Sequence, residues 1–385
     1  MGAGRADGHR GHPAVINDRL SEEHRALYDR TRKLAAQTLR PIAEEGQPGR
    51  VNRPLVRALA QQGLLTHLFP TTSAIELCLI REALATACTD AETAFAVQGL
   101  GAYPILQAGS PPIRDEWIPR VATGTAVAAF ALTEPEAGSD VSAISLKAEP
   151  DGDGYRLTGE KLWISNAPEA DIYTVFARTS GEGSRGLTAF AVPGESEGLT
   201  GEHRQLLAPH AIGSLHFDAV PVAREQTLGE PGAGFRVAMR TLDLFRPSVG
   251  AGVIGMAQAA IEHATTWLRW RTTFGQPLRN HQSLSHKLAD VVTRVTAARL
   301  LVHQAAAAHD AAEHDPALAA MAKLMATETA QEAVDFAVQV HGARGLEHGH
   351  PLEHLYREVR APRIYEGASE IQREIIARSL FRTAP

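Results

Sequence analysis

The chain has 385 residues, 44% of them hydrophobic, which is enough for one large globular unit or two to three packed domains. Its net charge of −6 and its dispersed lysines and arginines argue against a nucleic-acid-binding or membrane-surface protein. Cys78 and Cys88 have neither metal-ligand spacing nor a disulfide framework, which fits a reducing compartment. Because no apolar run is long enough to cross a bilayer, we expect a soluble, cytoplasmic protein.

Residues 19–125 are predicted to form a helical domain, after a tail over 1–18 that is rich in Gly, Arg and His and that we expect to be disordered. Ser21 is a predicted helix N-cap, since acidic residues follow it in the first turn, where the helix dipole favours them. Apolar residues then recur at helical spacing until Gly46 ends the helix. A second helix is expected over 74–87.

Residues 126–228 are predicted to form a compact domain of antiparallel β-hairpins. Four segments there alternate, or are rich in β-branched and aromatic residues, as is typical of strands. They are YRLTGEKLWIS (155–165), IYTVFART (172–179), GLTAFAVP (186–193) and SLHFDAVPV (214–222). Gly-rich turns such as DGDG (151–154) separate them.

Residues 229–385 are predicted to be helical again. An apolar stripe from Leu284 to Val302 marks one face of a long helix, and Asp315 before a proline marks the start of the next. Strands and helices do not alternate, which argues against a Rossmann sheet, although GEPGAGF (229–235) superficially resembles a phosphate loop. We interpret that segment as the turn that enters the helical domain.

Four separated motifs resemble those of acyl-CoA dehydrogenases. They are AFALTEPEAGSD (129–140), GEKLWISNA (159–167), the run from DLFRPSVGAG to SLSHKLAD (243–290) and the run from QVHGARG to IIARSL (339–380). The resemblance implies an α+β multi-domain fold with an N-terminal helical domain, a middle antiparallel β domain and a C-terminal four-helix bundle. It also implies a homotetramer, or a dimer, with FAD between the β domain and the bundle and a neighbouring subunit supplying part of the site.

The reaction that this resemblance implies takes a proton from Cα and a hydride from Cβ of an acyl thioester, leaving the trans-2-enoyl thioester. A flavin is a suitable hydride acceptor, so the protein must supply a base. Glu366, in RIYEGASEI, matches the family's base, and a carboxylate shielded from water should have a raised pKa. Gly367 permits close approach of the backbone to a ligand. The resemblance further implies that the backbone N–H of the base residue and a flavin ribityl hydroxyl hold the thioester oxygen.

Two other readings of the base are open to the sequence. Glu366 taken alone would be an ordinary turn carboxylate before the last helix. Some relatives carry their base on the helix facing the flavin, but that position here holds Phe245. The chain therefore retains one base, in the commoner place.

The resemblance also assigns cofactor and substrate positions. Those matching flavin-binding positions are Phe130, Leu132, Thr133, Ser139, Trp163, Ser165 and Glu370. Those matching contacts to the FAD of a partner subunit are Arg271, Phe274 and Gln282, and those matching an adenine-side contact are Gln339 and Gly342. An arginine suits this role because its planar fork can pair with a pyrophosphate. The positions matching the acyl-thioester channel are Ser139, Asp243, Arg246 and Tyr365.

Several of these residues have ordinary structural explanations. Trp163 could be a core aromatic on a strand, and Asp243 and Arg246 could form an ion pair on their helix. Ala368 and Ala343 replace the family's usual Thr and Gly, which removes a hydroxyl contact worth about 1 kcal/mol net. The shortened segment LFPTTSAIEL (68–77) leaves the acyl chain length open.

The histidine-rich segment EHGHPLEH (347–354) is a candidate metal site through His348, His350 and His354. Flavin chemistry needs no metal, so we expect none here. The leading hypothesis is an FAD-dependent acyl-CoA dehydrogenase that passes electrons to an electron-transfer flavoprotein. The alternatives are an acyl-CoA oxidase, a biosynthetic dehydrogenase acting on an acyl-carrier-protein thioester, and a flavin-free, non-catalytic paralogue.

Overall fold

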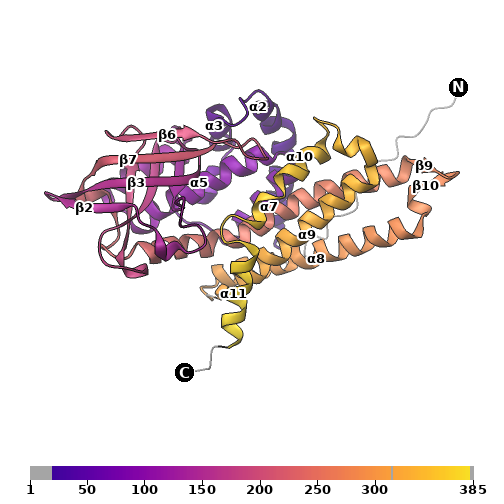
Figure 1. The fold of residues 1–385 in the computed structure, drawn as a ribbon. Coiled ribbons are helices and arrows are strands. Elements are labelled where there is room, and N and C mark those ends of the chain that lie inside the picture. The colour runs from indigo at the N-terminus through magenta and orange to yellow at the C-terminus, as the bar shows by residue number, and fades with distance from the viewer. Residues whose placement is uncertain (1–19, 314, 382–385) are drawn as a thin grey trace.

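The computed structural model describes residues 20–313 and 315–381. The tail predicted to be disordered, 1–18, lies outside these residues. Figure 1 shows an elongated molecule, with a β-sheet domain at one end and long helices running from it to a small hairpin at the other. None of the described helices combines the length and the apolar composition that crossing a bilayer requires.

The first helix begins where the sequence predicted. The Oγ of Ser21 caps α1 (Glu22–Leu34) by accepting a hydrogen bond from the His24 amide at 3.2 Å. A π-helical turn, η1 (Ala35–Leu39), and the short α2 (Arg40–Glu44) continue it. The π turn was not expected, and it immediately precedes Pro41, which has no amide hydrogen for an i→i−4 bond.

Helix α4 (Ala74–Ala87) has the predicted bounds, and it is buried along most of its length because α1, α5 and α7 pack against it. The other N-terminal helices are α3 (Arg53–Gln61), α5 (Thr89–Ala108) and α6 (Pro111–Ala122). The short 3-10 turns among the described residues are η2 (Leu65–Leu68), η3 (Val141–Ala143), η4 (Ser184–Gly186), η5 (Arg224–Gln226), η6 (Leu278–Asn280), η7 (Gly342–Leu346) and η8 (Ala361–Arg363).

The middle of the chain forms an eight-stranded sheet with the order β6-β7-β3-β2-β4-β5-β8 and with β1 beside β4. Its strands are β1 (Ala128–Ala131), β2 (Lys147–Asp151), β3 (Gly154–Ser165), β4 (Ile172–Arg178), β5 (Leu187–Pro193), β6 (Leu199–His203), β7 (Ile212–Val222) and β8 (Thr227–Leu228). The four predicted strands correspond to β3, β4, β5 and β7. Most pairs are antiparallel as expected, but β1 runs parallel to β4, and β2 meets β4 in one parallel pair.

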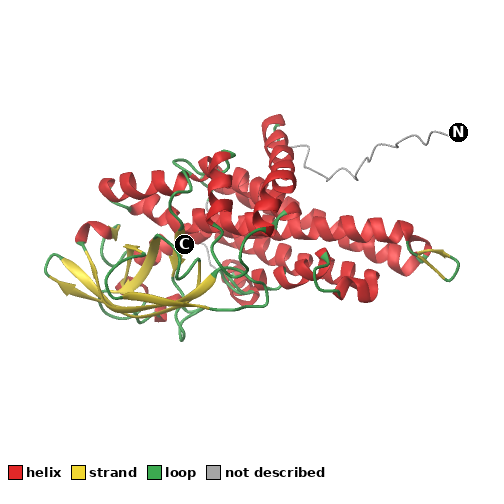
Figure 2. Cartoon of the chain, turned by 90° about the horizontal axis from the view of Figure 1, so that it is seen from above, coloured by secondary structure: helices red, strands yellow, loops and turns green. Residues whose placement is uncertain are grey.

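Helices cover the sheet on one side, as Figure 2 shows. Helix α5 packs against β1 and β4, and α7 (Gly234–Trp270) packs against β5. The sheet therefore connects directly to the long helices. The segment GEPGAGF (229–235) is the turn that leads into α7, as the sequence predicted.

The C-terminal part contains three long helices that pack on one another: α7, α8 (Gln282–Asp310) and α9 (Pro316–His341). A hairpin of β9 (Thr272–Thr273) and β10 (Gln276–Pro277) joins α7 to α8, and the side chain of Asp315 caps α9 as predicted. Two shorter helices pack against α9: α10 (Pro351–Glu358) and α11 (Ser369–Leu380). Helix α4 of the N-terminal part lies against α7 and α8.

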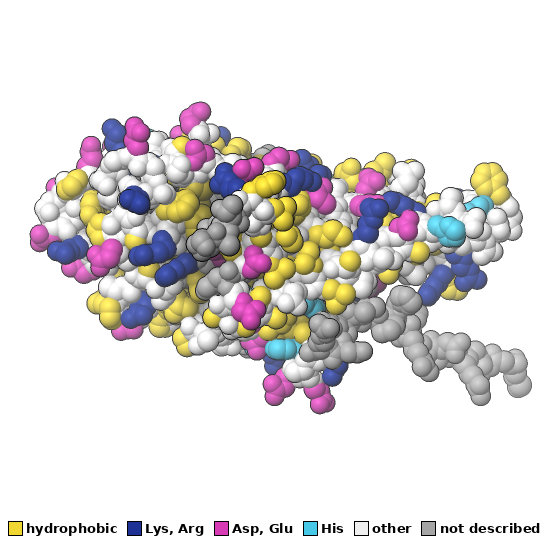
Figure 3. Space-filling view, turned by 90° about the horizontal axis from the view of Figure 1, so that it is seen from below, with side chains coloured by type: hydrophobic (Ala, Val, Ile, Leu, Met, Phe, Trp, Pro, Cys, Tyr) yellow, Lys and Arg dark blue, Asp and Glu magenta, His cyan; other side chains and the backbone are white. Residues whose placement is uncertain are grey.

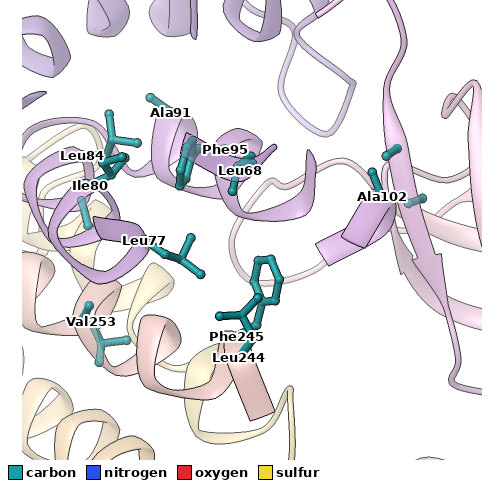
Figure 4. Packing of buried hydrophobic residues seen from close by; sticks show 14 of the residues in the cluster. Leu68, Leu77, Ile80, Leu84, Ala91, Phe95, Ala102, Leu244, Phe245 and Val253 are labelled. Carbon is teal, nitrogen blue, oxygen red and sulfur yellow. The ribbon is translucent and has the colours of Figure 1, made fainter. Parts of the chain in front are cut away.

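The core is continuous from the N-terminal helices into α7. Figure 4 shows Phe245 of α7 in the group of buried apolar side chains that includes Leu68 and Leu77. Gly99 of α5 permits this approach, since a Cβ there would lie 2.8 Å from the Phe245 ring and 2.8 Å from Leu68. The position that holds the base in some relatives is thus an apolar core position here.

A buried ion pair fixes the loop after β1 onto β3. The ammonium of Lys161 donates to Glu134 Oε1 at 2.9 Å and to the Leu132 carbonyl at 2.9 Å. Glu134 also accepts from the amides of Ser145 and Leu146, at 2.6 and 2.9 Å. Both charged side chains are almost completely buried, so this network holds the first motif in place.

Replacing Lys161 with Met should lower the free energy of unfolding by about 3–5 kcal/mol, because Glu134 would be left buried without its counter-ion. Urea unfolding of the holoprotein measures the change. The control is Arg156→Met, which removes an ion pair with Asp151 whose side chains are about half exposed and which should cost at most about 1 kcal/mol. A change below that of the control for Lys161→Met would contradict the prediction.

Candidate functional site

Glu366 lies in the turn between α10 and α11, in an unusual backbone conformation. Its φ is +51° and that of Gly367 is +95°, both in the left-handed region. A Cβ on Gly367 would also lie 2.5 Å from Nε2 of Gln372. The backbone angle therefore favours glycine after Glu366, and a side chain there would also displace the amide of Gln372.

Two side chains from different helices hold this turn. The buried ammonium of Lys323, on α9, donates to the carbonyls of Tyr365 and Gly367, at 3.0 and 2.8 Å. The Nε2 of Gln372, on α11, donates to the carbonyls of Glu366 and Gly367, at 3.2 and 2.9 Å. Every carbonyl from residue 365 to residue 367 thus accepts a side-chain hydrogen bond.

The half-buried carboxylate of Glu366 lies among several charges. Burial raises its pKa above the usual range for a glutamate, and Glu92 adds to that rise. Three cations oppose the rise: Arg81, Lys323 and Arg246. Oε2 of Glu366 is buried and has no hydrogen-bond partner within the described residues. A carboxylate with a raised pKa and an unpartnered oxygen has the properties of a general base.

The two arginines near Glu366 are themselves paired. Arg81 donates to Glu92 Oε1 at 2.6 Å and to Ser248 Oγ at 2.7 Å, and both members of the ion pair are buried. Arg246 donates to Asp243 Oδ1 at 2.9 Å, so the ion pair considered from the sequence is present on α7. Nε of Arg246 is nevertheless buried without a partner within the described residues. This unpartnered nitrogen is compatible with the predicted role of Arg246 in the thioester channel.

The predicted flavin residues of the β domain lie together at the junction of β1 and β3. The amide of Leu162 donates to the Thr133 carbonyl at 2.9 Å, and the side chain of Asn166 donates to the Ala128 carbonyl at 2.9 Å. These bonds bring Leu132 and Thr133 beside Trp163 and Ser165. Phe130 lies on β1, and the centroid of its ring is 4.9 Å from that of Phe176.

The side chains at this junction fit a flat heteroaromatic group. Trp163 is 49% exposed, so it is not the core aromatic that the sequence allowed. The register of β3 against β7 shifts between Lys161 and Ile164, and Trp163 has a φ of +59°. In the described part of the chain, the hydroxyls of Thr133 and Ser165 have no hydrogen-bond partner. An exposed indole beside free hydroxyls is suited to an isoalloxazine ring.

Three further predicted residues lie on exposed segments near the two halves of the site. Ser139 is exposed in the loop that follows Glu134. Tyr365, next to Glu366 in the chain, is 41% exposed. The Glu370 side chain, in the first turn of α11, is 81% exposed and lies 3.9 Å from Arg373.

The remaining predicted cofactor residues lie at the other end of the helices. They are Arg271, Phe274, Gln282, Gln339 and Gly342, and all five are exposed. They come from the end of α7, the β9–β10 hairpin, the start of α8 and the end of α9, which Figure 1 shows remote from the sheet. Phe274 is 97% exposed. Within one chain, this group does not meet Trp163 or Glu366.

Sequence reasoning missed Arg81, Glu92, Lys323 and Gln372. A signal was present, because Lys323 is the one charged residue of ALAAMAKLMA (317–326), and Arg81 follows the apolar run LCLI (77–80). A buried charge in such a stretch needs a partner and often belongs to a functional site. The sequence alone does not tell it from a surface lysine or arginine.

The histidines proposed as candidate metal ligands have separate partners. His350 caps α10 by accepting from the Leu352 amide at 3.1 Å, and His354 Nε2 lies 2.7 Å from Thr89 Oγ1. The side chain of His348 is 94% exposed. The described residues contain no group of three or more ligands that could hold a metal ion.

A cavity of about 950 Å³ lies away from this site, between α1–α2 and the ends of α7 and α9. Arg40, Trp267, His341 and Arg344 are among its lining residues, together with His350 of the candidate metal site, and none of the predicted catalytic, cofactor or substrate residues lines it. Trp267 stacks on His341 with ring centroids 4.9 Å apart. This cavity is therefore not where the predicted base and the predicted flavin residues of the β domain lie.

Comparison with known proteins identifies the family. Family models for the N-terminal, middle and C-terminal domains of acyl-CoA dehydrogenases match residues 21–125, 129–220 and 232–381. The cyclohexane-1-carbonyl-CoA dehydrogenase of Geobacter metallireducens is 34% identical over 375 residues, which cover 94% of this chain and 99% of that protein.

Solved structures agree. Butyryl-CoA dehydrogenase from Megasphaera elsdenii has a TM-score of 0.89 and 31% identity, covering 95% of this chain and 100% of that one. The FAD complex of PigA has a TM-score of 0.89 and 25% identity, covering 95% and 99%. The chain therefore belongs to the acyl-CoA dehydrogenase family and is an FAD-dependent oxidoreductase with acyl-CoA dehydrogenase activity.

Proposed function

We propose that this enzyme converts an acyl thioester to its trans-2-enoyl thioester, with Glu366 as the base that removes the α-proton. The observation that carries the proposal is the buried, unpartnered Oε2 of Glu366 in a turn held from two helices. Bound FAD supplies the acceptor for the β-hydride. One proton thus passes to the carboxylate and two electrons leave the substrate with the hydride, which balances the oxidation.

The backbone of the same residue is available for the thioester oxygen. The amide N–H of Glu366 donates to no group within the described residues, although its neighbours at 364 and 365 both donate to the Ala361 carbonyl. A free N–H beside the base can stabilise the negative charge that develops on the thioester oxygen as the proton leaves. Gly367 keeps this approach open, since it carries no side chain.

The two groups of predicted cofactor residues support a site shared between two copies of the chain. Phe130, Thr133 and Trp163 lie at the sheet end, whereas Arg271 and Phe274 lie exposed at the far end of the helices. A head-to-tail pair of copies would bring one copy's Arg271 to the other copy's flavin site. Figure 3 shows apolar side chains gathered along the middle of one face, a further feature of surfaces that bind other chains.

The electron acceptor and the acyl carrier are the finer parts of the proposal. We propose an electron-transfer flavoprotein as acceptor and an acyl-CoA as substrate, with butyryl-CoA and cyclohexane-1-carbonyl-CoA as the first compounds to test because relatives act on them. Steady oxygen consumption would instead indicate an oxidase, and activity restricted to carrier-bound acyl chains would indicate a biosynthetic enzyme. The flavin-free alternative does not stand, because the family uses FAD.

Replacing Glu366 with Gln should leave FAD bound but slow flavin bleaching by acyl-CoA by about 10²- to 10⁴-fold, because the amide cannot accept the α-proton. Anaerobic stopped-flow spectroscopy across an acyl-CoA panel measures the rate. Glu374→Gln is the matched control, since Glu374 is an exposed carboxylate on α11 paired with Arg378. Bleaching by Glu366→Gln at the control rate would remove Glu366 from the proposed role.

The rate of flavin bleaching should rise with pH, because only the deprotonated carboxylate acts as a base. Since burial raises the pKa of Glu366, the midpoint of this rise should lie above the value of about 4.3 for a free glutamate. The pH dependence of the single-turnover rate at low substrate concentration reports this ionisation of the free enzyme. A midpoint at or below the value for free glutamate would show that the carboxylate is not shielded as proposed.

A shared site predicts complementation between two inactive variants. Arg271→Ala should weaken FAD binding on the order of 10- to 100-fold, because a charge-assisted hydrogen bond is lost. In a mixed pair with Glu366→Gln, one site carries both defects and the other carries neither. At an FAD concentration too low to load Arg271→Ala, co-expressed, differently tagged chains purified as the mixed oligomer should therefore regain activity, while each variant alone stays inactive. Failure of the purified mixed oligomer to regain activity would exclude the shared site.

A further inference from the structure

Lys323 is a fully buried lysine whose ammonium donates its hydrogen bonds to a single turn. It lies on α9, within an apolar stretch, and none of its side chain is exposed. Its Nζ donates to the carbonyls of Tyr365 and Gly367, at 3.0 and 2.8 Å. These carbonyls belong to the residues on either side of Glu366. No carboxylate accepts a hydrogen bond from this ammonium in the described part of the chain.

The charge of Lys323 is expensive to bury. Desolvation lowers its pKa to about 8, although the nearby carboxylates of Glu366, Glu328 and Glu370 act to raise it. A methionine would fill the same space on α9 without that penalty. Packing therefore does not explain a buried ammonium that donates only to backbone carbonyls. Support of the turn that carries these carbonyls does.

The turn requires a support because its conformation is unfavourable. A left-handed backbone costs roughly 1–2 kcal/mol in a non-glycine residue such as Glu366, whose φ is +51°. The carboxylate lies three bonds beyond Cα, so a small rotation of the backbone displaces its oxygens considerably. Gln372 holds the carbonyl of Glu366 itself, whereas Lys323 holds the carbonyls before and after it.

We propose that Lys323 is a positioning residue, whose ammonium clamps the backbone on both sides of Glu366 and so places the carboxylate for removal of the α-proton. The inference rests on the proposed role of Glu366. Lys323 acts through the turn and does not itself take part in the proton transfer. Its loss should slow the chemical step while leaving acyl-thioester binding nearly unchanged.

The test compares Lys323→Met, which keeps the volume but removes the donors, with Lys323→Gln, which keeps two N–H donors without charge. Lys323→Met should slow anaerobic flavin bleaching by about 100-fold, as expected for a displacement of about 1 Å in the base. The dissociation constant for acyl-CoA should change by less than about 3-fold. Lys323→Gln should recover part of the lost rate, because an amide can still donate to the two carbonyls. Lys33→Met, at an exposed lysine on α1, is the control for loss of a charge.

A second measurement separates positioning from general damage. In D₂O, the exchange of substrate α-hydrogens by the oxidised holoenzyme reports proton removal alone, and it should slow together with bleaching in Lys323→Met. A purely structural role would instead lower FAD content and melting temperature while the molecules that retain FAD bleach at the wild-type rate. That outcome would overturn the proposal, as would unchanged exchange.

Each failure can be told apart. If Glu366→Gln bleaches normally, the proposed base is wrong and the clamp loses its purpose. If Glu366→Gln is inactive but Lys323→Met behaves like wild type, only the clamp is overturned. If Lys323→Met does not retain FAD, the bleaching rate of Lys323→Gln decides the question. A wild-type rate, whatever the substrate affinity, contradicts the clamp. A slowed rate with normal substrate binding supports it.

Discussion

The proposed base, Glu366, must have a carboxylate that is sheltered from water and yet able to ionise, and the surrounding structure acts on it in both directions. Burial favours the neutral acid, whereas Arg81, Lys323 and Arg246 favour the anion. The three cations come from α4, α9 and α7, so the balance exists only when the N-terminal and C-terminal helices are packed together. Packing of α4 against α7 is thus a condition for the chemistry as well as for stability.

The β domain contributes in a different way. Its predicted flavin residues lie at a junction held by polar contacts, among them the buried Lys161–Glu134 pair. That pair ties the first motif to the second, and the bulge in β3 then turns Trp163 outward. The proposed cofactor surface thus lies on strands, while the proposed base lies on a short turn. Rigid support of both partners favours a reproducible distance between them.

The overall order of helices, strands and helices could be predicted from the sequence, because periodicity changes clearly along the chain. Strand β1 could not, since its residues AAFA (128–131) have no alternation and its parallel pairing with β4 depends on contacts distant in sequence. The π turn before Pro41 was also unforeseen. The roles of Glu366, Gly367 and the flavin positions were inferred from motifs and stay predictions. Lys323 and Gln372 did not, because a single polar residue in a helix reveals its partner only after the helices are packed.

One geometric detail limits how this enzyme can change over evolutionary time. A methyl group at position 367 would lie 2.5 Å from the amide nitrogen of Gln372, and the glutamine in turn holds the carbonyls of the turn. A side chain at position 367 would therefore displace the Gln372 amide and break its bonds to the carbonyls of Glu366 and Gly367. We accordingly expect the tolerated residues at positions 367 and 372 to depend on each other.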